Sequence, residues 1–198
     1  QPELRRALEQ LGRKKLVLNF FNFGDSHEKD ERYSSKTADE IVRAAYEMGA
    51  VKTGALIVIE QDMMLDEYVR TGINVDGIVT SQLLINIFEH NTPLHDGAVI
   101  IRDNKVTTAC SYLPLSESNK ISKEFGTRHR AAIGLSEQTD ALTFVVSEET
   151  GAISIAYKGN FLHDLSVQEF EHELSLILLK EQEPRQLFFQ RWIGGGEK

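Results

Sequence analysis

Short apolar runs of strand length alternate with helix-start patterns along this chain, and this alternation limits the possible folds. Runs rich in β-branched and apolar residues predict strands at 55–60, 97–101, 106–112, 141–146 and 153–157. Helical spacing and capping boxes predict helices at 2–11, 37–48, 62–70, 81–90, 128–135 and 166–180. We therefore expect an α/β fold with helices flanking a mixed, largely antiparallel central sheet.

Length and apolar content set the expected domain organisation. A chain of 198 residues with 41% hydrophobic residues can bury one core, and it is too short for two comfortable domains. We expect one domain over residues 1–180 and a flexible tail over 181–198. The lone Cys110 excludes an intrachain disulfide and is expected to be a buried structural thiol in a reducing compartment. The core is also expected to hold Met48, Met63, Met64 and the helical stripe Phe170, Leu174, Ile177 and Leu178.

Charge and hydropathy exclude two classes of function for the residues present. A net charge of −8 argues against a general nucleic-acid binder, because such proteins need an excess of Lys and Arg. No apolar run reaches the 18 or so residues of a membrane span, and no signal peptide is recognisable. The chain begins at Gln1 rather than Met, which suggests part of a longer protein. Its basic residues between positions 5 and 15 fit either a solvated helix end or the cytoplasmic edge of a membrane helix.

The tract Asp96-Gly97-Ala98 places a carboxylate before two small residues at the start of a predicted strand. Glycine lets the backbone come close to a ligand, although Asp-Gly is also common in turns. Here the turn would be held against the sheet, so Asp96 is the candidate catalytic carboxylate. The adjoining His95 and Asp96 together would bind Mn²⁺ or Co²⁺ more readily than Mg²⁺, which prefers oxygen ligands.

A second tract, Thr127-Arg128-His129-Arg130, opens a predicted helix. Arginine forks match phosphate oxygens, and a helix N-terminus presents free N–H groups. Each residue also has a structural explanation: a surface salt bridge for either arginine, core packing for His129 and an N-cap for Thr127. The two arginines point to different sides of the first turn. With Asp96, the tract predicts a triphosphate site with a carboxylate for metal or hydroxyl activation.

Two further groups of residues are candidates for the same site. The polar residues Ser147, Glu148 and Glu149 follow a predicted strand at a turn, where polar residues are expected in any case. Tyr112 follows the predicted hairpin, where it either stacks on an adenine or packs in the core.

The chain resembles the diadenylate cyclase family, of the membrane-bound CdaA type, over roughly residues 1–160. The similar segments are QPELRRALEQLGR, TGALIVIE, SQLLINIF, NTPLHDGAVII, RHRAAIGLSE and VVSEETGAIS. The resemblance implies the diadenylate cyclase domain fold and the condensation of two ATP into cyclic di-AMP and two pyrophosphates, assisted by divalent Mn²⁺, Mg²⁺ or Co²⁺. It implies that Asp96 activates the attacking 3′-hydroxyl, with His95 and Glu149 as further candidate metal ligands. The substrate-binding candidates are Gly97, Ala98, Tyr112, Thr127, Arg128, His129, Arg130, Ser147 and Glu149.

The resemblance also implies partners and a location. Two subunits would form a face-to-face homodimer, and a protein covering the dimerising face could regulate it. Transmembrane helices directly before QPELRRALE would place the domain at the cytoplasmic face of the cell membrane. Two alternatives remain: a non-catalytic sensor of ATP or cyclic di-AMP, and another metal-dependent nucleotidyltransferase or phosphatase. Asp96 argues against the sensor, because without a metal a carboxylate would repel the phosphates.

Overall fold

The structure is a computed structural model that describes residues 32–118, 121–122 and 125–178. The chain divides into two units, Gln1–Asp30 and Glu31–Lys198, and all of the described residues belong to the second. The helix expected at 2–11, the basic residues near the start and the tail expected at 181–198 therefore lie outside the described residues. The single domain over 1–180 stays a prediction. Within the described part of the chain, no helix is long and apolar enough to cross a membrane.

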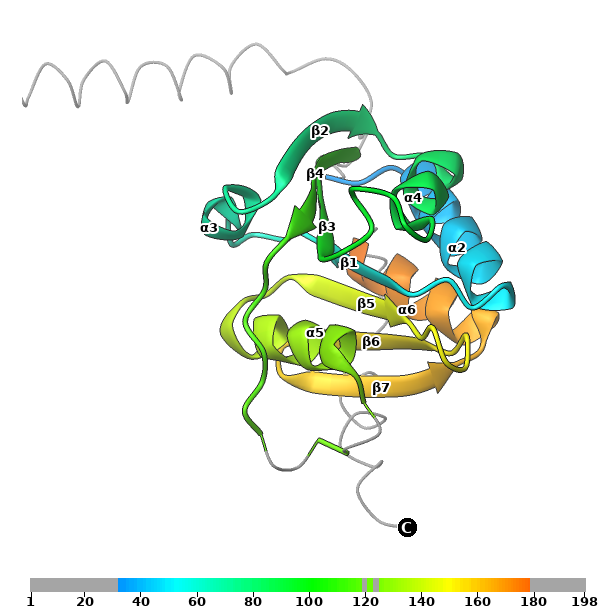
Figure 1. Cartoon of the computed structure of the whole chain (residues 1–198), viewed down its shortest axis with the longest axis vertical. Coiled ribbons are helices and arrows are strands. Elements are labelled where there is room, and N and C mark those ends of the chain that lie inside the picture. The colour runs from blue at the N-terminus through cyan, green and yellow to red at the C-terminus, as the bar shows by residue number, and fades with distance from the viewer. Residues whose placement is uncertain (1–31, 119–120, 123–124, 179–198) are drawn as a thin grey trace, which may run out of the picture. The chain divides into compact units, whose positions relative to one another are not determined.

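Seven strands form one sheet in the order β2-β4-β3-β1-β5-β6-β7 (Figure 1). Only β1 and β3 run parallel, so the expected mixed, largely antiparallel sheet is confirmed. The edge strands β2 and β7 were not predicted, because none of their residues is buried and they form no continuous apolar run. The strand bounds are β1 (Ala55–Ile59), β2 (Ile73–Ile78), β3 (Ala98–Arg102), β4 (Lys105–Ser111), β5 (Leu142–Val146), β6 (Ile153–Tyr157) and β7 (Asn160–Leu165).

Helices cover both faces of this sheet (Figure 1). On one face, α2 (Ser35–Ala50) packs against α4 (Ser81–Phe88) and α6 (Val167–Leu178). On the other face, α5 (Thr127–Gln138) lies across β1, β5, β6 and β7, and the short α3 (Asp66–Val69) contacts β4. The central strands are therefore buried from both sides, which explains why they are continuous apolar runs in the sequence.

The side chains of β1 show how the two cores are separated. Ile57 and Ile59 belong to the hydrophobic cluster shared with α2, α4 and α6. Leu56 and Val58 point the other way and belong to the cluster shared with α5. Successive strand residues face opposite sides of a sheet, so one five-residue strand contributes to both cores. This double burial holds both ends of β1 in place.

The N-terminal caps of α6 and α2 differ in how well the sequence predicted them. The capping box of α6 is confirmed: the Ser166 hydroxyl donates to Glu169 Oε2 at 2.9 Å, and the Glu169 N–H donates to Ser166 Oγ at 3.3 Å. The N-cap expected at Thr37 is wrong. Ser34 caps α2 instead by accepting from the Thr37 N–H, while the buried Thr37 hydroxyl donates to Asn104 at 2.7 Å. A tertiary contact has therefore taken over the predicted capping side chain.

Helix α3 begins four residues later than the helix expected at 62–70, and side chains bind N–H groups of the segment before it. Asp140 accepts from the N–H groups of Asp62 and Met63, and Glu60 accepts from that of Leu65. Met63 and Met64 consequently lie on the surface, 48% and 59% exposed, so their assignment to the core is wrong.

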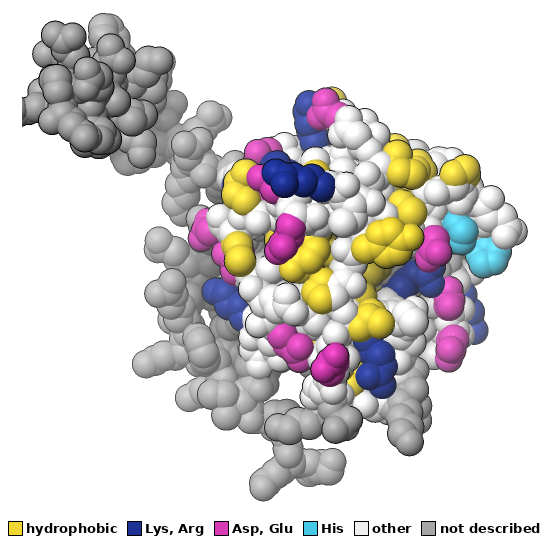
Figure 2. Space-filling model, turned by 60° about the vertical axis from the view of Figure 1, so that its left-hand side comes forward, with side chains coloured by type: hydrophobic (Ala, Val, Ile, Leu, Met, Phe, Trp, Pro, Cys, Tyr) yellow, Lys and Arg dark blue, Asp and Glu magenta, His cyan; other side chains and the backbone are white. Residues whose placement is uncertain are grey.

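Met48 lies in the core as expected, together with Phe170, Leu174 and Leu178, while Ile177 is partly buried against it. Cys110 is only partly buried, so the expectation of a buried thiol is wrong; it lies at a strand irregularity with a φ of +59°. The side of the molecule that carries α3 displays several apolar side chains between charged ones (Figure 2). The large exposed apolar residues are Tyr46, Val51, Met63, Met64, Ile73, Ile78, Tyr112 and Leu115.

Candidate active site

Asp96 is exposed and lies on a backbone turn that packs directly against β4. Gly97 has a φ of +111°, and a Cβ atom there would lie 2.9 Å from the carbonyl carbon of Cys110. Only glycine fits both the left-handed conformation and this close approach. Ala98 begins β3 with its side chain fully buried, so only its backbone faces a ligand. The Asp-Gly turn is therefore rigid and presents the carboxylate to solvent.

Tyr112 lies beside this turn, directly after β4. Ala98 pairs with Ser111, which places the next residue on β4 at the same end of the sheet as Asp96 and Gly97. The Tyr112 ring is 74% exposed, so core packing is wrong for this residue. Its backbone N–H donates to the Thr71 hydroxyl at 2.9 Å, which holds the main chain in place while the ring stays free to contact a ligand.

Strand register brings the ends of three strands, β1, β3 and β5, together at one end of the sheet. Ile57 of β1 pairs with Val99 of the parallel β3, and Ala55 pairs with Val146 of the antiparallel β5. The starts of β1 and β3 therefore lie beside the end of β5. Adjacent strands are about 4.8 Å apart, so Asp96 lies two strands, roughly 10 Å, from Ser147.

The turn between β5 and β6 is held by its own hydrogen bonds. Ser147 is 9% exposed, and its Oγ accepts from the N–H groups of Glu149 and Thr150 at 3.3 and 3.2 Å. Gly151 has a φ of +81°, and its backbone lies so close to Gly49 that neither residue could carry a Cβ without displacement. Ser147 thus forms the turn and keeps its hydroxyl proton for a further acceptor, while the side chain of Glu149 is exposed.

Helix α5 starts beside this turn with an uncapped N-terminus. The N-cap position is Gly126, which has no side chain to offer, so the expected N-cap at Thr127 is wrong. The first N–H groups of a helix have no intrahelical partner, and here the N-cap residue makes no side-chain hydrogen bond to one of them. Arg128 Nη1 forms an ion pair with Glu148 Oε2 at 2.7 Å. Gly54, just before β1, lies beneath this pair.

His129 is the least satisfied polar side chain of the site. It is 8% exposed, and its Nε2 atom has no hydrogen-bond partner among the described residues. Its ring centroid lies 5.1 Å from that of Phe125 and 6.3 Å from that of His163. Burial, followed by the charges of His163 and Arg128, lowers the pKa of His129, so the ring is neutral near pH 7. The predicted structural histidine is buried as expected, but it is not satisfied.

A cavity of about 290 Å³ joins most of these groups. Among the predicted site residues it includes Thr127, Arg128, His129, Ser147 and Glu149, but not His95, Asp96, Gly97, Ala98, Tyr112 or Arg130. Its full lining is Phe125, Gly126, Thr127, Arg128, His129, Val145, Val146, Ser147, Glu148, Glu149, Thr150 and His163. The two sequence tracts thus reach the same end of the sheet, but only the second lines the cavity.

Phe125 and His163 in the cavity lining, and Gly54 beneath the Arg128–Glu148 pair, are not among the predicted site residues. Phe125 and His163 form an aromatic cluster with His129, and His163 Nδ1 lies 2.8 Å from the Ser154 hydroxyl. Since β7 was not predicted, no signal pointed to His163. Gly54 stands directly before a predicted strand, which was the one sequence signal available for it.

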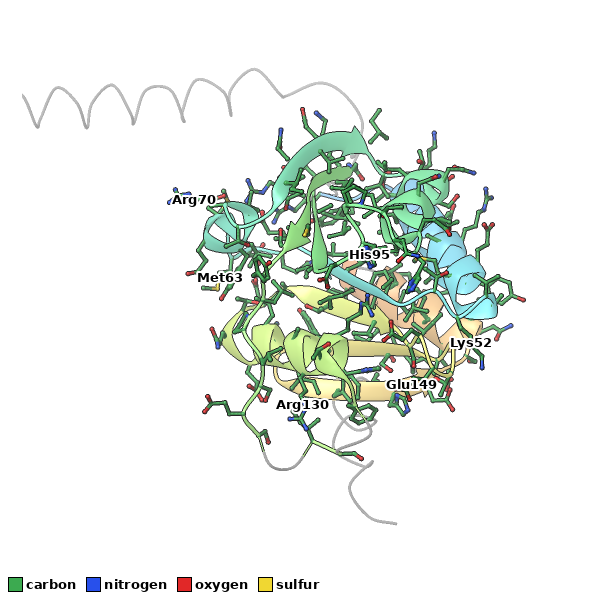
Figure 3. All side chains as sticks on the ribbon, viewed as in Figure 1. Lys52, Met63, Arg70, His95, Arg130 and Glu149 are labelled. Carbon is green, nitrogen blue, oxygen red and sulfur yellow. The ribbon has the colours of Figure 1, made fainter. Side chains whose placement is uncertain are left out.

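Six of the predicted site residues do not line the cavity, and Figure 3 labels two of them. Arg130 lies below α5 in Figure 3, away from Glu149 at the β5–β6 turn. His95 lies on the β3 side of β1, whereas Glu149 lies on the β5 side (Figure 3). Among the described residues, no three His, Cys, Asp or Glu side chains gather closely enough to hold a metal ion.

Comparisons with known proteins show which family the chain resembles. The family model described as "DisA bacterial checkpoint controller nucleotide-binding" (DAC) matches residues 42–161. A diadenylate cyclase of Listeria monocytogenes is 48% identical over 98% of this chain and 69% of its own length. The cyclic di-AMP synthase CdaA of Bacillus subtilis is 47% identical over 100% of this chain and 70% of its own length.

A solved structure shares the fold. The crystal structure of a double mutant of DacA from Staphylococcus aureus superposes with a TM-score of 0.70 at 48% identity, covering 71% of this chain and 93% of that one. The family model covers more than half of the chain, and the tracts Asp96-Gly97-Ala98 and Arg128-His129-Arg130 both fall within the matched residues. The chain therefore belongs to the diadenylate cyclase family of nucleotidyltransferases.

Proposed function

We propose that this protein condenses two molecules of ATP into cyclic di-AMP and releases two pyrophosphates. One observation carries the proposal: the uncapped start of α5 opens into a cavity with Arg128 and the unpartnered Nε2 of His129, at the sheet end that presents Asp96. A buried polar atom without a partner carries a desolvation cost that a ligand can relieve. Cationic and N–H donors at a helix start suit phosphate oxygens.

In this proposal each residue has a limited task. The first N–H groups of α5, Thr127 and Arg128 hold the triphosphate, and His129 donates a hydrogen bond from its otherwise unpartnered nitrogen. Ser147 donates its free hydroxyl proton to the phosphates. Arg130, which does not line the cavity, reaches a different part of the nucleotide or has a structural role. Positioning of this kind supplies much of the rate enhancement in phosphoryl transfer.

Near the adenosine, Gly97 and Ala98 offer their backbone and Tyr112 its exposed ring for stacking on adenine. Asp96 lies beside this ring and accepts the proton of the attacking 3′-hydroxyl. That hydroxyl attacks the α-phosphorus of another ATP, a P–O bond forms, and the bond to pyrophosphate breaks.

The donor types at the site suit a divalent metal ion. Within the described part of a single chain, however, no three such side chains lie close enough together to bind one. His95 Nδ1 lies 2.6 Å from the Thr92 carbonyl oxygen, which can only accept, so Nδ1 carries the proton and Nε2 keeps the lone pair that a metal needs. Asp96 and Glu149 are exposed carboxylates. We infer that His95, Asp96 and Glu149 are the candidate ligands, with Mn²⁺ or Co²⁺ favoured over Mg²⁺ by the imidazole. The ion would neutralise charge on the phosphates and the leaving group.

The reaction requires a second subunit, because each 3′-hydroxyl must meet the α-phosphate of another ATP. We infer a face-to-face homodimer in which each subunit contributes one nucleotide. The exposed apolar residues Tyr112 and Leu115, close in sequence to the site, are compatible with a surface that a second copy covers. A protein that covered the same face would inhibit turnover without blocking ATP binding.

We also infer that the complete protein is membrane-associated, as the resemblance to the CdaA type implies. The basic residues that support this inference lie outside the described residues. Cell fractionation of the natural full-length protein tests it: recovery in the soluble fraction would contradict it. Nucleic acid is not expected as a partner. An electrophoretic mobility-shift assay with duplex DNA checks this, and we expect no shifted band.

Product analysis after incubation with ATP and Mn²⁺ tests the main proposal. We expect cyclic di-AMP and pyrophosphate in a ratio of one to two, with activity per subunit falling on dilution to monomers that light scattering detects. ATP binding without turnover would instead support the sensor, and release of inorganic phosphate would support a phosphatase. Activity that stays constant in demonstrably monomeric protein would overturn the dimer mechanism.

A further inference from the structure

The ion pair between Arg128 and Glu148 is not required by the reaction just proposed. Arg128 Nη1 and Glu148 Oε2 are 2.7 Å apart, and both residues line the cavity. Their side chains are 22% and 59% exposed, so the pair lies at the mouth of the cavity rather than in the core. The guanidinium that is expected to bind phosphate is therefore already paired with a carboxylate.

The backbone around the pair restricts its movement. A Cβ atom on Gly54 would lie 2.8 Å from Arg128 Nη1 and 2.9 Å from Glu148 Oε2, so the two charged groups rest directly on the chain before β1. Glu148 follows Ser147, whose Oγ and backbone oxygen hold the turn through three hydrogen bonds. The carboxylate is therefore held beside Arg128 by the fold and does not pair with it by chance.

The pair leaves the cavity poor in positive charge. Among the described residues that line the cavity, Arg128 is the only Lys or Arg, and the lining also contains the carboxylates of Glu148 and Glu149. His129 adds no charge near pH 7, because burial lowers its pKa. An incoming triphosphate thus meets one cation that is already neutralised. Arginine has five N–H donors in a fixed fork, and the pair engages one terminal nitrogen, so donors remain for a phosphate.

We propose that Glu148 is an internal counter-ion of Arg128, which holds the guanidinium at the cavity and weakens its attraction for phosphate oxygens. The bound triphosphate competes with this carboxylate, so Glu148 lowers the affinity of the site for free ATP. The penalty is smaller for ATP bound to a divalent cation, because the cation neutralises part of the phosphate charge. Glu148 is therefore a specificity-determining residue that favours metal-bound over free nucleotide. This inference rests on the proposed function, in which Arg128 binds the triphosphate.

Calorimetric titration of Glu148→Gln with ATP in EDTA tests the proposal. The amide keeps the size of the side chain and can still accept from Arg128, but it removes the charge. We expect free ATP to bind about three- to tenfold more tightly than to the wild type, the range of partly exposed charge interactions. With Mn²⁺ present the gain should be smaller, and adenosine should bind with unchanged affinity.

Two matched variants separate this effect from general electrostatics. Combining Glu148→Gln with Arg128→Ala should abolish the gain, because no guanidinium remains to be released. Glu171→Gln removes the same charge from an exposed position on α6, across the sheet from α5, and should not change ATP affinity. Circular dichroism melting of each variant verifies folding, and Glu148→Ser replaces Glu148→Gln if the latter unfolds.

The outcomes also distinguish this inference from the proposed function. A wild type that neither binds ATP nor forms cyclic di-AMP would remove the proposed function itself. A wild type that binds and reacts, with unchanged or weaker binding of free ATP by Glu148→Gln, would overturn only the role of Glu148. An equal gain in the Arg128→Ala background would also overturn it, because the effect would then not pass through Arg128.

Discussion

Charged side chains lie at both ends of strand β1, but the two ends differ in whether the chain supplies hydrogen-bond partners for the polar groups there. At the C-terminal end, Glu60 is fully buried. Its oxygens accept from Arg32 at 2.6 Å, from Arg102 at 2.8 and 2.7 Å, and from the Leu65 N–H at 2.9 Å. Asp66 and Asp103 each pair with one of these arginines. The chain thus supplies every partner that this buried carboxylate needs.

At the N-terminal end the chain leaves groups unsatisfied. His129 Nε2 is buried without a partner among the described residues, the start of α5 has no capping side chain, and Asp96 and Glu149 are exposed. Buried polar atoms in proteins are normally hydrogen-bonded, so an exception needs an explanation. The comparison shows that clustered charge alone does not mark a functional site. Unsatisfied donors beside exposed carboxylates are the stronger indication, because a ligand can supply the missing partners.

The largest expected effect is the loss of turnover in Asp96→Asn. The amide preserves shape but removes the charge that accepts the proton, so we expect cyclic di-AMP formation to fall by about 10²–10⁴-fold, with ATP still bound. Product chromatography and calorimetry measure the two quantities. Asp103→Asn, at the opposite end of β1, removes the same charge and should leave the rate within about twofold of the wild type. Retention of half the wild-type activity by Asp96→Asn would show that Asp96 is not the catalytic carboxylate.

Glu60→Ala, at the other end of β1, is expected to lower the stability of the fold. Removing the buried carboxylate leaves Arg32 and Arg102 without their shared partner, which should lower the free energy of unfolding by about 3–5 kcal/mol. Urea denaturation measures it. Lys105→Ala breaks the exposed pair with Asp76 and should cost at most about 1 kcal/mol. If Glu60→Ala were no more destabilising than this control, the buried network would not stabilise the fold.

A smaller effect, confined to the phosphates, is expected when Arg128 and Arg130 are both replaced by alanine. Hydrogen bonds to charged groups contribute about 1.5–3 kcal/mol, so ATP affinity should fall by about 10- to 100-fold while adenosine affinity holds. Calorimetry with both ligands measures the difference. Arg70→Ala, near α3 and far from Glu149 in Figure 3, is the control and should change neither affinity. Equal losses for ATP and adenosine would indicate a structural role for the two arginines.

The smallest effect concerns the pH dependence of stability. Burial, then the charges of His163 and Arg128, lowers the pKa of His129 below its ordinary value of 6.5. As pH falls below about 6.5, the unfolded chain therefore takes up more protons at this residue than the folded chain, and the folded state loses stability. Thermal melts between pH 7.5 and about pH 5.5 should show a steeper loss for the wild type than for His129→Phe. Parallel curves would show that His129 is not held neutral by its surroundings.

Much of the framework could be predicted from local sequence. The buried strands β1, β3, β5 and β6 are apolar runs because both faces of the sheet are covered, and the Ser166–Glu169 capping box forms as expected. The edge strands β2 and β7 were not predicted, because partly exposed strands lack the continuous apolar run that indicates a buried strand. The helix expected at 62–70 spans only Asp66–Val69, and the N–H groups just before it donate to Glu60 and to Asp140, which lies far away in the sequence.

For the site, local sequence was enough to predict the residue types: a carboxylate before a glycine, and a tract with two arginines and a histidine at a helix start. These are local properties, since a left-handed glycine and the free N–H groups of a helix need no distant partner. Three features of the site depend on tertiary packing. Arg128 pairs with Glu148 above Gly54. Arg130 lies outside the cavity, and His163 lines it. Pairing register and packing bring such residues together across tens of positions, and no local pattern encodes those distances.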